Sequence, residues 1–225
     1  MTYAVRYAYA VRMSTRPRRP LTRERIVAAG TAIADRDGLS GVSMRKVATK
    51  LGCEVMSLYN HVSNKGDLLA EMLDRVYAEI PPMDDALGWR RALRTTALAA
   101  RDALVRHPWS AALLTGTFPG PARRQHMEDM LRALSIAGLP DDVADLGFHA
   151  VMVHVQGFSQ QQIGFGERPA ALAQEAERFL ANAAADDNPL FVAHLGYHAE
   201  RGHRHDDFTF VLDLILDGLE RAVTH

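Results

Sequence analysis

The side chains best placed to recognise another molecule lie on a short helix that we predict for residues 55–61. The residues on its face opposite Leu58 are Val55, Met56, Tyr59 and Asn60, with Ser57 near the edge. Amide and hydroxyl groups can bond the base edges and phosphates of DNA, and apolar groups can contact the methyl group of thymine. This face therefore predicts a surface that binds DNA.

A second helix, predicted for residues 44–51, positions this surface. Its apolar residues recur at i, i+3, i+4 and i+7: Met44, Val47, Ala48 and Leu51. Ser43 is placed to cap the start of this helix, and Gly52 to end it in a left-handed conformation. Two helices joined by such a turn form the helix-turn-helix, which lays its second helix in the major groove of DNA. The spacing alone also fits an ordinary helical hairpin, which is common in all-α proteins.

The charge distribution favours the DNA-binding interpretation. Residues 1–65 hold twelve Lys and Arg against four Asp and Glu, whereas residues 66–225 hold fourteen against twenty-three. The basic end suits a polyanion, and the acidic remainder would repel one. All three lysines, Lys46, Lys50 and Lys65, lie between residues 43 and 65. We interpret Lys46 and Lys50 as a solvated face, and Ser43 and Asn64 as further phosphate contacts from helix ends.

Residues 22–76 resemble the DNA-binding domain of the TetR family of transcriptional repressors. The region opens with LTRERIVAAGTAIADRDG, and the run LYNHVSNKGDLL is its most specific part. The resemblance extends to the C-terminus, where FTFVLDLILDGLERAV is similar to the last helix of the branch that contains the tetracycline repressor. It implies a regulator, most simply a repressor, that binds a palindromic double-stranded operator as a homodimer and is released by a small-molecule effector.

The resemblance also assigns roles to individual residues. Arg45 matches a family residue that can bond O6 and N7 of a guanine, and Tyr59 and Lys65 match phosphate-contacting residues. Val55 and Met56 depart from the more polar residues of the tetracycline repressor, so we expect a different operator. The residues predicted to contact DNA are Ser43, Arg45, Val55, Met56, Ser57, Tyr59, Asn60, Asn64 and Lys65.

We predict an all-α fold in three parts: a flexible basic arm at 1–20, a helix-turn-helix DNA-binding domain at 21–66, and a helical effector-binding and dimerisation domain at 67–225. Caps, apolar faces, glycines and prolines give the helix ranges. These are 22–37, 44–51, 55–61, a helix capped by Ser63 or Asn64 that stops before Pro81, 89–108, 122–137, 141–163, 170–185, 189–200 and a last helix capped by Asp206 or Asp207. The run GFGERP at 164–169 is expected to break the long helix before it.

The last helix predicts a dimer. Its acidic residues Asp213, Asp217 and Glu220 recur at i, i+4 and i+7, and apolar residues cover nearly all of the remaining circumference. Such a helix must bury against its own domain and against a second surface. In a symmetric dimer, the second surface is the partner's copy of this helix and of the helix at 145–162, and the family uses such a four-helix interface.

The helices between residues 89 and 160 offer side chains suited to a small-molecule pocket. His149, Gln156 and Gln160 recur on one helix at i, i+7 and i+11, and polar groups inside a domain need partners or water, which a ligand can displace. We expect a planar or elongated, largely apolar effector; alternatively, the methionines of this region only fill a core. The residues predicted to bind the effector are Trp89, Leu93, His107, Phe118, Met127, Met130, Leu134, His149, Met152, Gln156, Phe158 and Gln160.

The histidines raise a metal hypothesis. His194 and His198 have an i, i+4 ligand spacing, and His203 and His205 follow, but neither a cysteine pair nor an HExxH motif accompanies them. We therefore predict no metal and no cofactor. His107 matches a metal-side histidine of the tetracycline repressor, so a metal that accompanies the effector stays open.

Other classes of protein find little support. The sequence has no phosphate-binding loop or nucleophile elbow, so we predict no catalytic residues and no enzyme. No apolar run is long enough for a membrane span, and the single cysteine, Cys53, fits a reducing compartment. We expect a cytoplasmic protein. The alternative function is a helical metal-binding or small-molecule-binding protein, or an enzyme, without specific DNA binding.

Overall fold

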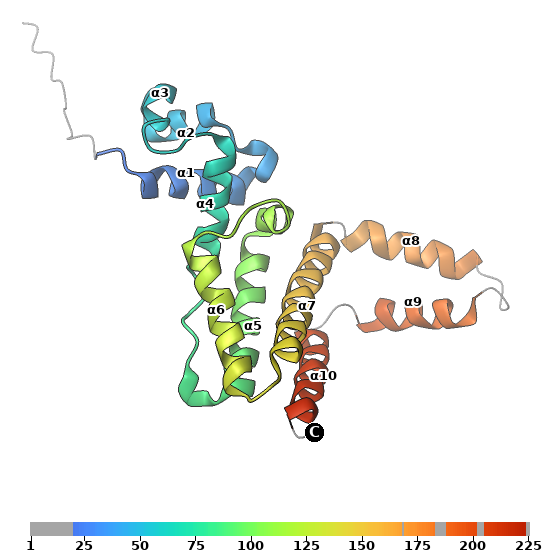
Figure 1. The fold of residues 1–225 in the computed structure, drawn as a ribbon. Helices are drawn as coiled ribbons and strands as arrows, with labels where there is room; N and C mark the ends of the chain where they lie inside the picture. The colour runs from blue at the N-terminus through green and yellow to red at the C-terminus, as the bar shows by residue number, and fades with distance from the viewer. Residues whose placement is uncertain (1–19, 168, 183–187, 202–204, 224–225) are drawn as a thin grey trace, which may run out of the picture.

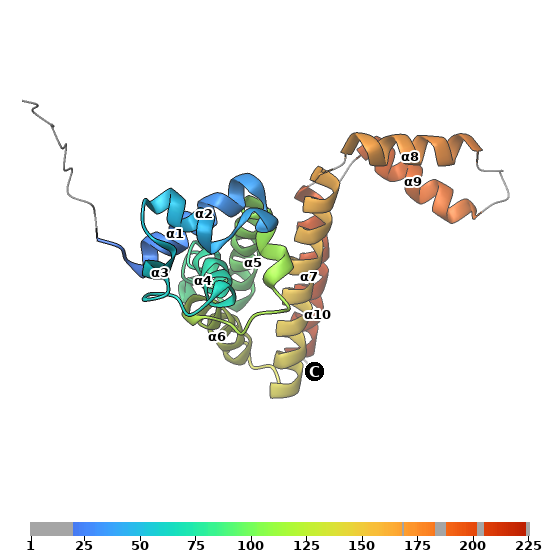
Figure 2. The same ribbon diagram turned by 90° about the horizontal axis from the view of Figure 1, so that it is seen from above.

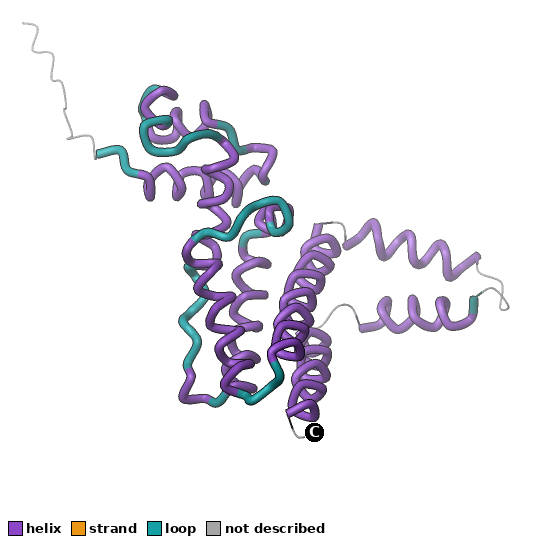
Figure 3. Tube along the Cα trace, viewed as in Figure 1, coloured by secondary structure: helices purple, strands orange, loops and turns teal. Residues whose placement is uncertain are grey.

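The structure is a computed structural model that describes residues 20–167, 169–182, 188–201 and 205–223. The regular elements within these ranges are helices, which confirms the predicted all-α fold (Figure 3). The basic arm predicted for residues 1–20 lies outside the described residues, except for Pro20.

The N-terminal helices are α1 (Arg23–Asp37), η1 (Leu39–Gly41), α2 (Met44–Leu51) and α3 (Val55–Leu58), at the top of Figure 1. Their ends follow the sequence as predicted. Thr22 caps α1, Ser43 caps α2, and Gly52 ends α2 at φ 67°, where an L side chain would be strained. α1 and α2 pack together over a core that includes Ile26 and Val47.

The predicted recognition helix is shorter than expected, because α3 ends at Leu58 and not at His61. The Leu58 carbonyl accepts the N–H groups of both His61 (2.9 Å) and Val62 (3.0 Å), so the following residues form a tight turn. Leu58 and Val62 are both buried and anchor this segment to the core. The segment is thus held by packing, as a helix of this length requires.

Helix α4 (Lys65–Tyr77) connects the N-terminal helices to the rest of the chain (Figure 1). Asn64 caps it, and the predicted boundary between residues 66 and 67 falls in its first turn. Its buried residues contact α1 at one end and α6 at the other: Leu68, Met72, Leu73, Val76 and Tyr77. A single continuous helix therefore spans both parts of the chain.

The larger part contains η2 (Asp85–Leu87), α5 (Trp89–Arg106), η3 (Pro108–Leu113), α6 (Pro121–Ile136), α7 (Asp141–Glu167) and α10 (His205–Val223). α5 packs against both α6 and α7, and α7 also packs against α10. The shared core includes Leu93, Leu134, Phe148 and Phe208. Ile136, the last residue of α6, is 67% exposed.

Two further predicted helix ends are wrong. α7 continues through Gly164 and Gly166 to Glu167, because a glycine costs a helix only about 1 kcal/mol and does not by itself end it. α10 begins at His205, so Asp206 and Asp207 lie in its first turn and do not precede it.

The remaining helices, α8 (Pro169–Asn182) and α9 (Pro189–Arg201), form a hairpin that projects from the end of α7 (Figure 2). α8 and α9 contact each other, with the rings of Phe179 and Phe191 5.4 Å apart.

Candidate DNA-binding surface and effector domain

The predicted base-reading residues lie on an exposed surface formed by α3 and the turn after it. Met56 is 73% exposed and Tyr59 43% exposed, and Asn60 is also exposed. Val55 and Ser57 are half-buried at the side of this surface. An exposed methionine at the tip of an anchored helix has no packing role in the folded chain, so it is available to a partner.

The helices around this surface also carry exposed cations. Arg45, Lys46, Lys50 and Lys65 are exposed, and no ion pair holds them within the part of the chain that the structure describes. Arg23, by contrast, is bonded to Asp67 and Glu71 in the same group of helices. Cations outside a salt bridge are available to neutralise phosphates, whereas a paired arginine would first have to leave its carboxylates.

Ser43 and Asn64 are both engaged at helix ends. Ser43 Oγ accepts the N–H of Lys46 (3.2 Å), and Asn64 Oδ1 accepts the N–H of Asp67 (2.9 Å). These side chains fix the orientation of α2 and α4. Because both side chains act here as acceptors, the Ser43 hydroxyl proton and the Asn64 amide N–H groups can still donate to a phosphate, beside the backbone N–H groups at the helix starts.

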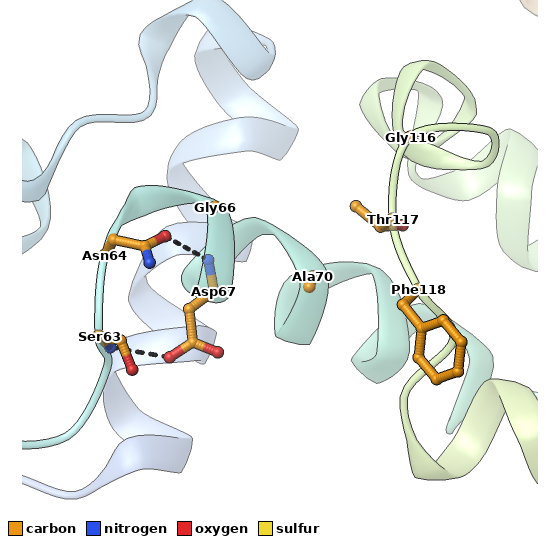
Figure 4. Close-up of a pocket in the computed structure, with 8 residues that line it drawn as sticks. All are labelled: Ser63, Asn64, Gly66, Asp67, Ala70, Gly116, Thr117 and Phe118. Atoms are coloured by element: carbon orange, nitrogen blue, oxygen red, sulfur yellow. Dashed lines mark hydrogen bonds between the residues drawn. The ribbon is translucent and has the colours of Figure 1, made fainter.

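An open groove of about 460 Å³ lies between the start of α4 and the loop that precedes α6 (Figure 4). Ser63, Asn64 and Asp67 line one side, and Gly116, Thr117 and Phe118 line the other. The Phe118 ring is 84% exposed. The groove thus brings a predicted DNA-contacting residue, Asn64, near a predicted effector residue, Phe118, at the junction of the two parts.

The predicted effector residues differ widely in burial. Four are buried in the core between α5, α6 and α7: Leu93, Met130, Leu134 and Met152. Four are half-buried: Trp89, Met127, Gln156 and Phe158. His149, Gln160 and Phe118 are exposed. The inward polar stripe that we expected on α7 is therefore wrong for this chain, because His149 faces outward beside Asp145 and Gln160 is exposed.

His107 is buried and bonded to carboxylates on both sides. Its Nδ1 lies 2.7 Å from Asp35 Oδ1 in α1, and its Nε2 lies 3.2 Å from Glu79 Oε1, just after α4. Trp109 Nε1 also donates to Asp35 Oδ1, at 2.7 Å. With both nitrogens engaged, His107 connects elements of the chain to one another in this structure.

Sequence reasoning missed a buried polar cluster between α4 and α6, formed by Tyr77, Arg123 and His126. The guanidinium of Arg123 lies 5.6 Å from the centre of the Tyr77 ring, and the His126 ring lies 5.4 Å from it. Arg123 Nε and His126 Nε2 are buried without a hydrogen-bond partner. Burial lowers the pKa of His126 to about 4, so its imidazole is neutral at neutral pH. The available signal was the i, i+3 spacing of Arg123 and His126 on one helix face.

The acidic stripe of α10 faces its own chain. Arg94 donates to Asp213, and Arg90 donates to Asp217 and Glu220, so α5 and α10 are joined by ion pairs. Phe208, Leu212, Leu216 and Leu219 are buried on the core side. The large apolar side chains that stay exposed on the described parts of α10 and α7 are Phe210 (65%), Val211 (40%), Leu214 (53%), Val223 (37%), Leu146 (67%) and Val153 (66%).

Within the described ranges, no group of three or more His, Cys, Asp and Glu side chains is arranged to hold a metal ion. His203, one of the residues behind the metal hypothesis, lies outside those ranges. Among the described helices, none is long and apolar enough to cross a membrane.

Comparison with known proteins agrees with this architecture. Residues 81–223 match the family model described as "Tetracyclin repressor-like, C-terminal domain". The chain is 35% identical over 222 residues to an HTH-type transcriptional repressor, DrrR1, of Streptomyces coeruleorubidus, covering 94% of this chain and 82% of that protein.

Two solved structures share the fold over nearly all of both chains. ActR from Streptomyces coelicolor, in complex with actinorhodin, is 26% identical with a TM-score of 0.77, covering 92% of this chain and 100% of that one. BioQ from Mycobacterium smegmatis has also been solved. BioQ in complex with its double-stranded DNA operator is 25% identical with a TM-score of 0.63, covering 90% of this chain and 99% of that one. Proteins of this kind are generally not enzymes. The chain belongs to the tetracycline-repressor (TetR) family of transcriptional regulators.

Proposed function

We propose that this regulator is a homodimeric repressor that binds a palindromic operator and leaves it when a small molecule binds the larger helical part. The observation that carries the DNA-binding half of this proposal is the α3 surface, where Met56 and Tyr59 are exposed, together with the exposed cations Arg45 and Lys65 on the helices beside it. Residues 21–66 would read DNA, residues 67–225 would bind the effector and the partner, and the protein would work in the cytoplasm. The relative BioQ, solved with its operator, supports this assignment.

The exposed apolar side chains of α7 and α10 support the homodimer. These side chains lie on two helices that pack against each other, so they form neighbouring parts of one surface. A surface of this kind on a monomer marks an interface, and a two-fold axis would let it cover its own copy. Two copies are also needed to place two recognition helices about one turn of DNA apart, at roughly 34 Å.

For the effector site we propose the region between α4, α5, α6 and α7. Its walls would be Leu93, Met130, Leu134 and Met152, with Trp89, Met127, Gln156 and Phe158 at the edges. The unpartnered nitrogens of Arg123 and His126 would then bind a polar group of the ligand, since buried polar atoms require a partner. ActR, solved with actinorhodin, shows that a protein of this fold can hold a small molecule.

The DNA-binding half is tested by selecting bound duplexes from random DNA with the full chain. The proposal expects enrichment of a palindrome with two half-sites, in keeping with a two-fold symmetric protein. A selected pool without any enriched motif would refute specific binding. It would favour the alternative function without DNA binding, in which the basic end of the chain serves only solubility.

The effector half is tested by calorimetry, starting with actinorhodin, the ligand of the ActR relative, and extending to hits from a thermal-shift screen. Effector and operator must weaken each other by the same factor, typically ~5 to 150-fold, because coupling between two binding sites is reciprocal. A compound with equal affinity for the free and the operator-bound protein would not be an inducer.

A further inference from the structure

The buried guanidinium of Arg123, in the first turn of α6, has no carboxylate partner among the described residues. Arg123 is 9% exposed, and its guanidinium donates to two main-chain carbonyls, those of Leu114 (2.8 Å) and Thr117 (3.3 Å). Arg101 of α5, which is buried to a similar degree, is by contrast paired with Asp102. Removing a charge from water is costly unless an opposite charge compensates for it. The charge of Arg123 is therefore left for another molecule to neutralise.

The carboxylates beside this part of α6, Asp74 and Asp129, have other partners. Asp74 of α4 accepts the main-chain N–H groups of Ala122 (3.1 Å) and Arg123 (2.9 Å), so it caps the helix. Asp129 is buried and accepts a side-chain bond from Arg132 (2.9 Å). Neither carboxylate is paired with the Arg123 guanidinium. The start of α6 thus keeps a positive charge that these two aspartates do not bind.

Two nitrogen atoms on the same face of α6 are buried without a hydrogen-bond partner in the described chain. They are Arg123 Nε and His126 Nε2, and the two side chains flank the ring of Tyr77. Buried polar atoms need a partner, and residues at i and i+3 of a helix are neighbours. A carboxylate has two acceptor oxygens, so it would satisfy both nitrogens when His126 carries its proton on Nε2.

The buried face of α6 changes from polar to apolar along the helix. Arg123 and His126 lie near its start, and Met130 and Leu134 follow on the buried side. From Arg123 to Leu134 the helix rises about 16 Å, at roughly 1.5 Å per residue. This gradient matches an elongated molecule with a charged group at one end and an apolar body.

We propose that Arg123 and His126 form an anion site in the larger helical part of the chain, and that the effector carries a carboxylate bound there. The apolar body of the effector lies along α6 towards Met130 and Leu134. This inference rests on the effector site proposed above, to which it adds the charge and the orientation of the ligand. A neutral ligand would leave the charge of Arg123 uncompensated.

The test compares carboxylic acids with their primary amides, which have nearly the same shape but no charge. The panel holds planar acids of increasing length, among them 2-naphthoic acid, anthracene-2-carboxylic acid and anthraquinone-2-carboxylic acid, each beside its amide. Binding to the full chain is measured by isothermal titration calorimetry at neutral pH. At least one acid should bind about tenfold or more tightly than its amide, because charge-assisted hydrogen bonds are roughly twice as strong as neutral ones.

Arg123→Gln should lower the affinity of this acid to that of its amide. Arg124→Gln is the matched control, because it makes the same change at the neighbouring, exposed arginine of α6 and should leave both affinities unchanged. His126→Phe keeps a ring beside Tyr77 but removes Nε2, so it should weaken the acid by about threefold to tenfold. Circular dichroism checks the fold, and His126→Phe tests the site by itself if Arg123→Gln does not fold.

The proposal is overturned if every amide binds as tightly as its acid, if no acid of the panel binds, or if the preference for an acid survives Arg123→Gln or, where that variant does not fold, His126→Phe. Each compound that binds is also titrated in the presence of the selected operator. A neutral compound that binds as tightly as its acid and weakens operator binding would remove the anion site and leave the proposed function standing. An acid whose binding requires Arg123 but does not change operator affinity would support the anion site and contradict the effector half of the proposed function.

Discussion

If the proposed homodimer forms through α7 and α10, Phe210→Asp should convert it into monomers while each chain stays folded. The ring is 65% exposed on α10 and lies on the surface that also carries Leu214 and Val211. Fully burying a phenylalanine side chain stabilises by about 1.5–3 kcal/mol, so covering the exposed part contributes ~1–2 kcal/mol per copy. Because each copy buries its own Phe210 at a two-fold interface, the substitution removes about 2–4 kcal/mol of dimerisation free energy. This raises the dimer dissociation constant roughly 30- to 1000-fold. The aspartate adds the cost of removing a charge from water, which makes this a lower bound.

The assay is sedimentation equilibrium across a concentration series, with far-UV circular dichroism to check the fold. The position matters, because Leu212 and Leu216 on the same helix are fully buried in the chain's own core, and a charge there would unfold the protein. Phe118→Asp is the matched control: it places the same charge on an 84% exposed ring in the groove near α4. If Phe210→Asp sediments as a dimer with an unchanged constant, the α7–α10 surface is not the interface.

Three further predictions concern DNA binding, backbone strain and pH. Lys65→Ala should weaken binding to all DNA sequences and flatten the slope of log K against log salt by ~1. Arg45→Ala should cost ~1–3 kcal/mol of binding free energy and relax the preference at one base pair. Identical losses of affinity on every sequence for both variants would contradict the assigned roles. Gly52→Ala should lower the free energy of unfolding by about 1–2 kcal/mol in urea titrations, because φ is 67° there, while Gly116→Ala, with open space around it and no positive φ, should have little effect. The pKa of His126 in the folded chain is about 4, below its ordinary value of 6.5. Between these values the unfolded chain binds a proton that the folded chain does not, so the free energy of unfolding falls by roughly 3 kcal/mol as the pH drops from 6.5 towards 4. His126→Gln should flatten urea-derived stability over that range, and an unchanged pH slope would show that another group is responsible.

Helix ends proved predictable where a side chain or a glycine decides them locally. Thr22, Ser43 and Asn64 cap the helices that follow them, and Gly52 makes the turn, because each acts within a few residues of its own position. The end of α7 was not predictable in this way. Gly164 and Gly166 weaken the helix only slightly, and the glycine-rich run does not stop it before Glu167.

The candidate effector site could be predicted only in part, because it depends on contacts between helices far apart in sequence. Periodicity shows that Met130 and Leu134 share a face, and both are buried. It does not show that Arg94 of α5 bonds Asp213, so it does not show that the acidic stripe of α10 lies against α5. Nor does it show that Asp35 binds His107, which was predicted to contact the effector.

The most direct test of the central claim is a fluorescence anisotropy titration of the palindrome selected from random DNA, at several salt concentrations, beside a scrambled duplex of equal length. We predict two chains per palindrome, at least ~1000-fold tighter binding than to the scrambled duplex, and a steep loss of affinity with salt. Equal affinity for the two duplexes would contradict the proposal that the surface of α3 reads a specific operator.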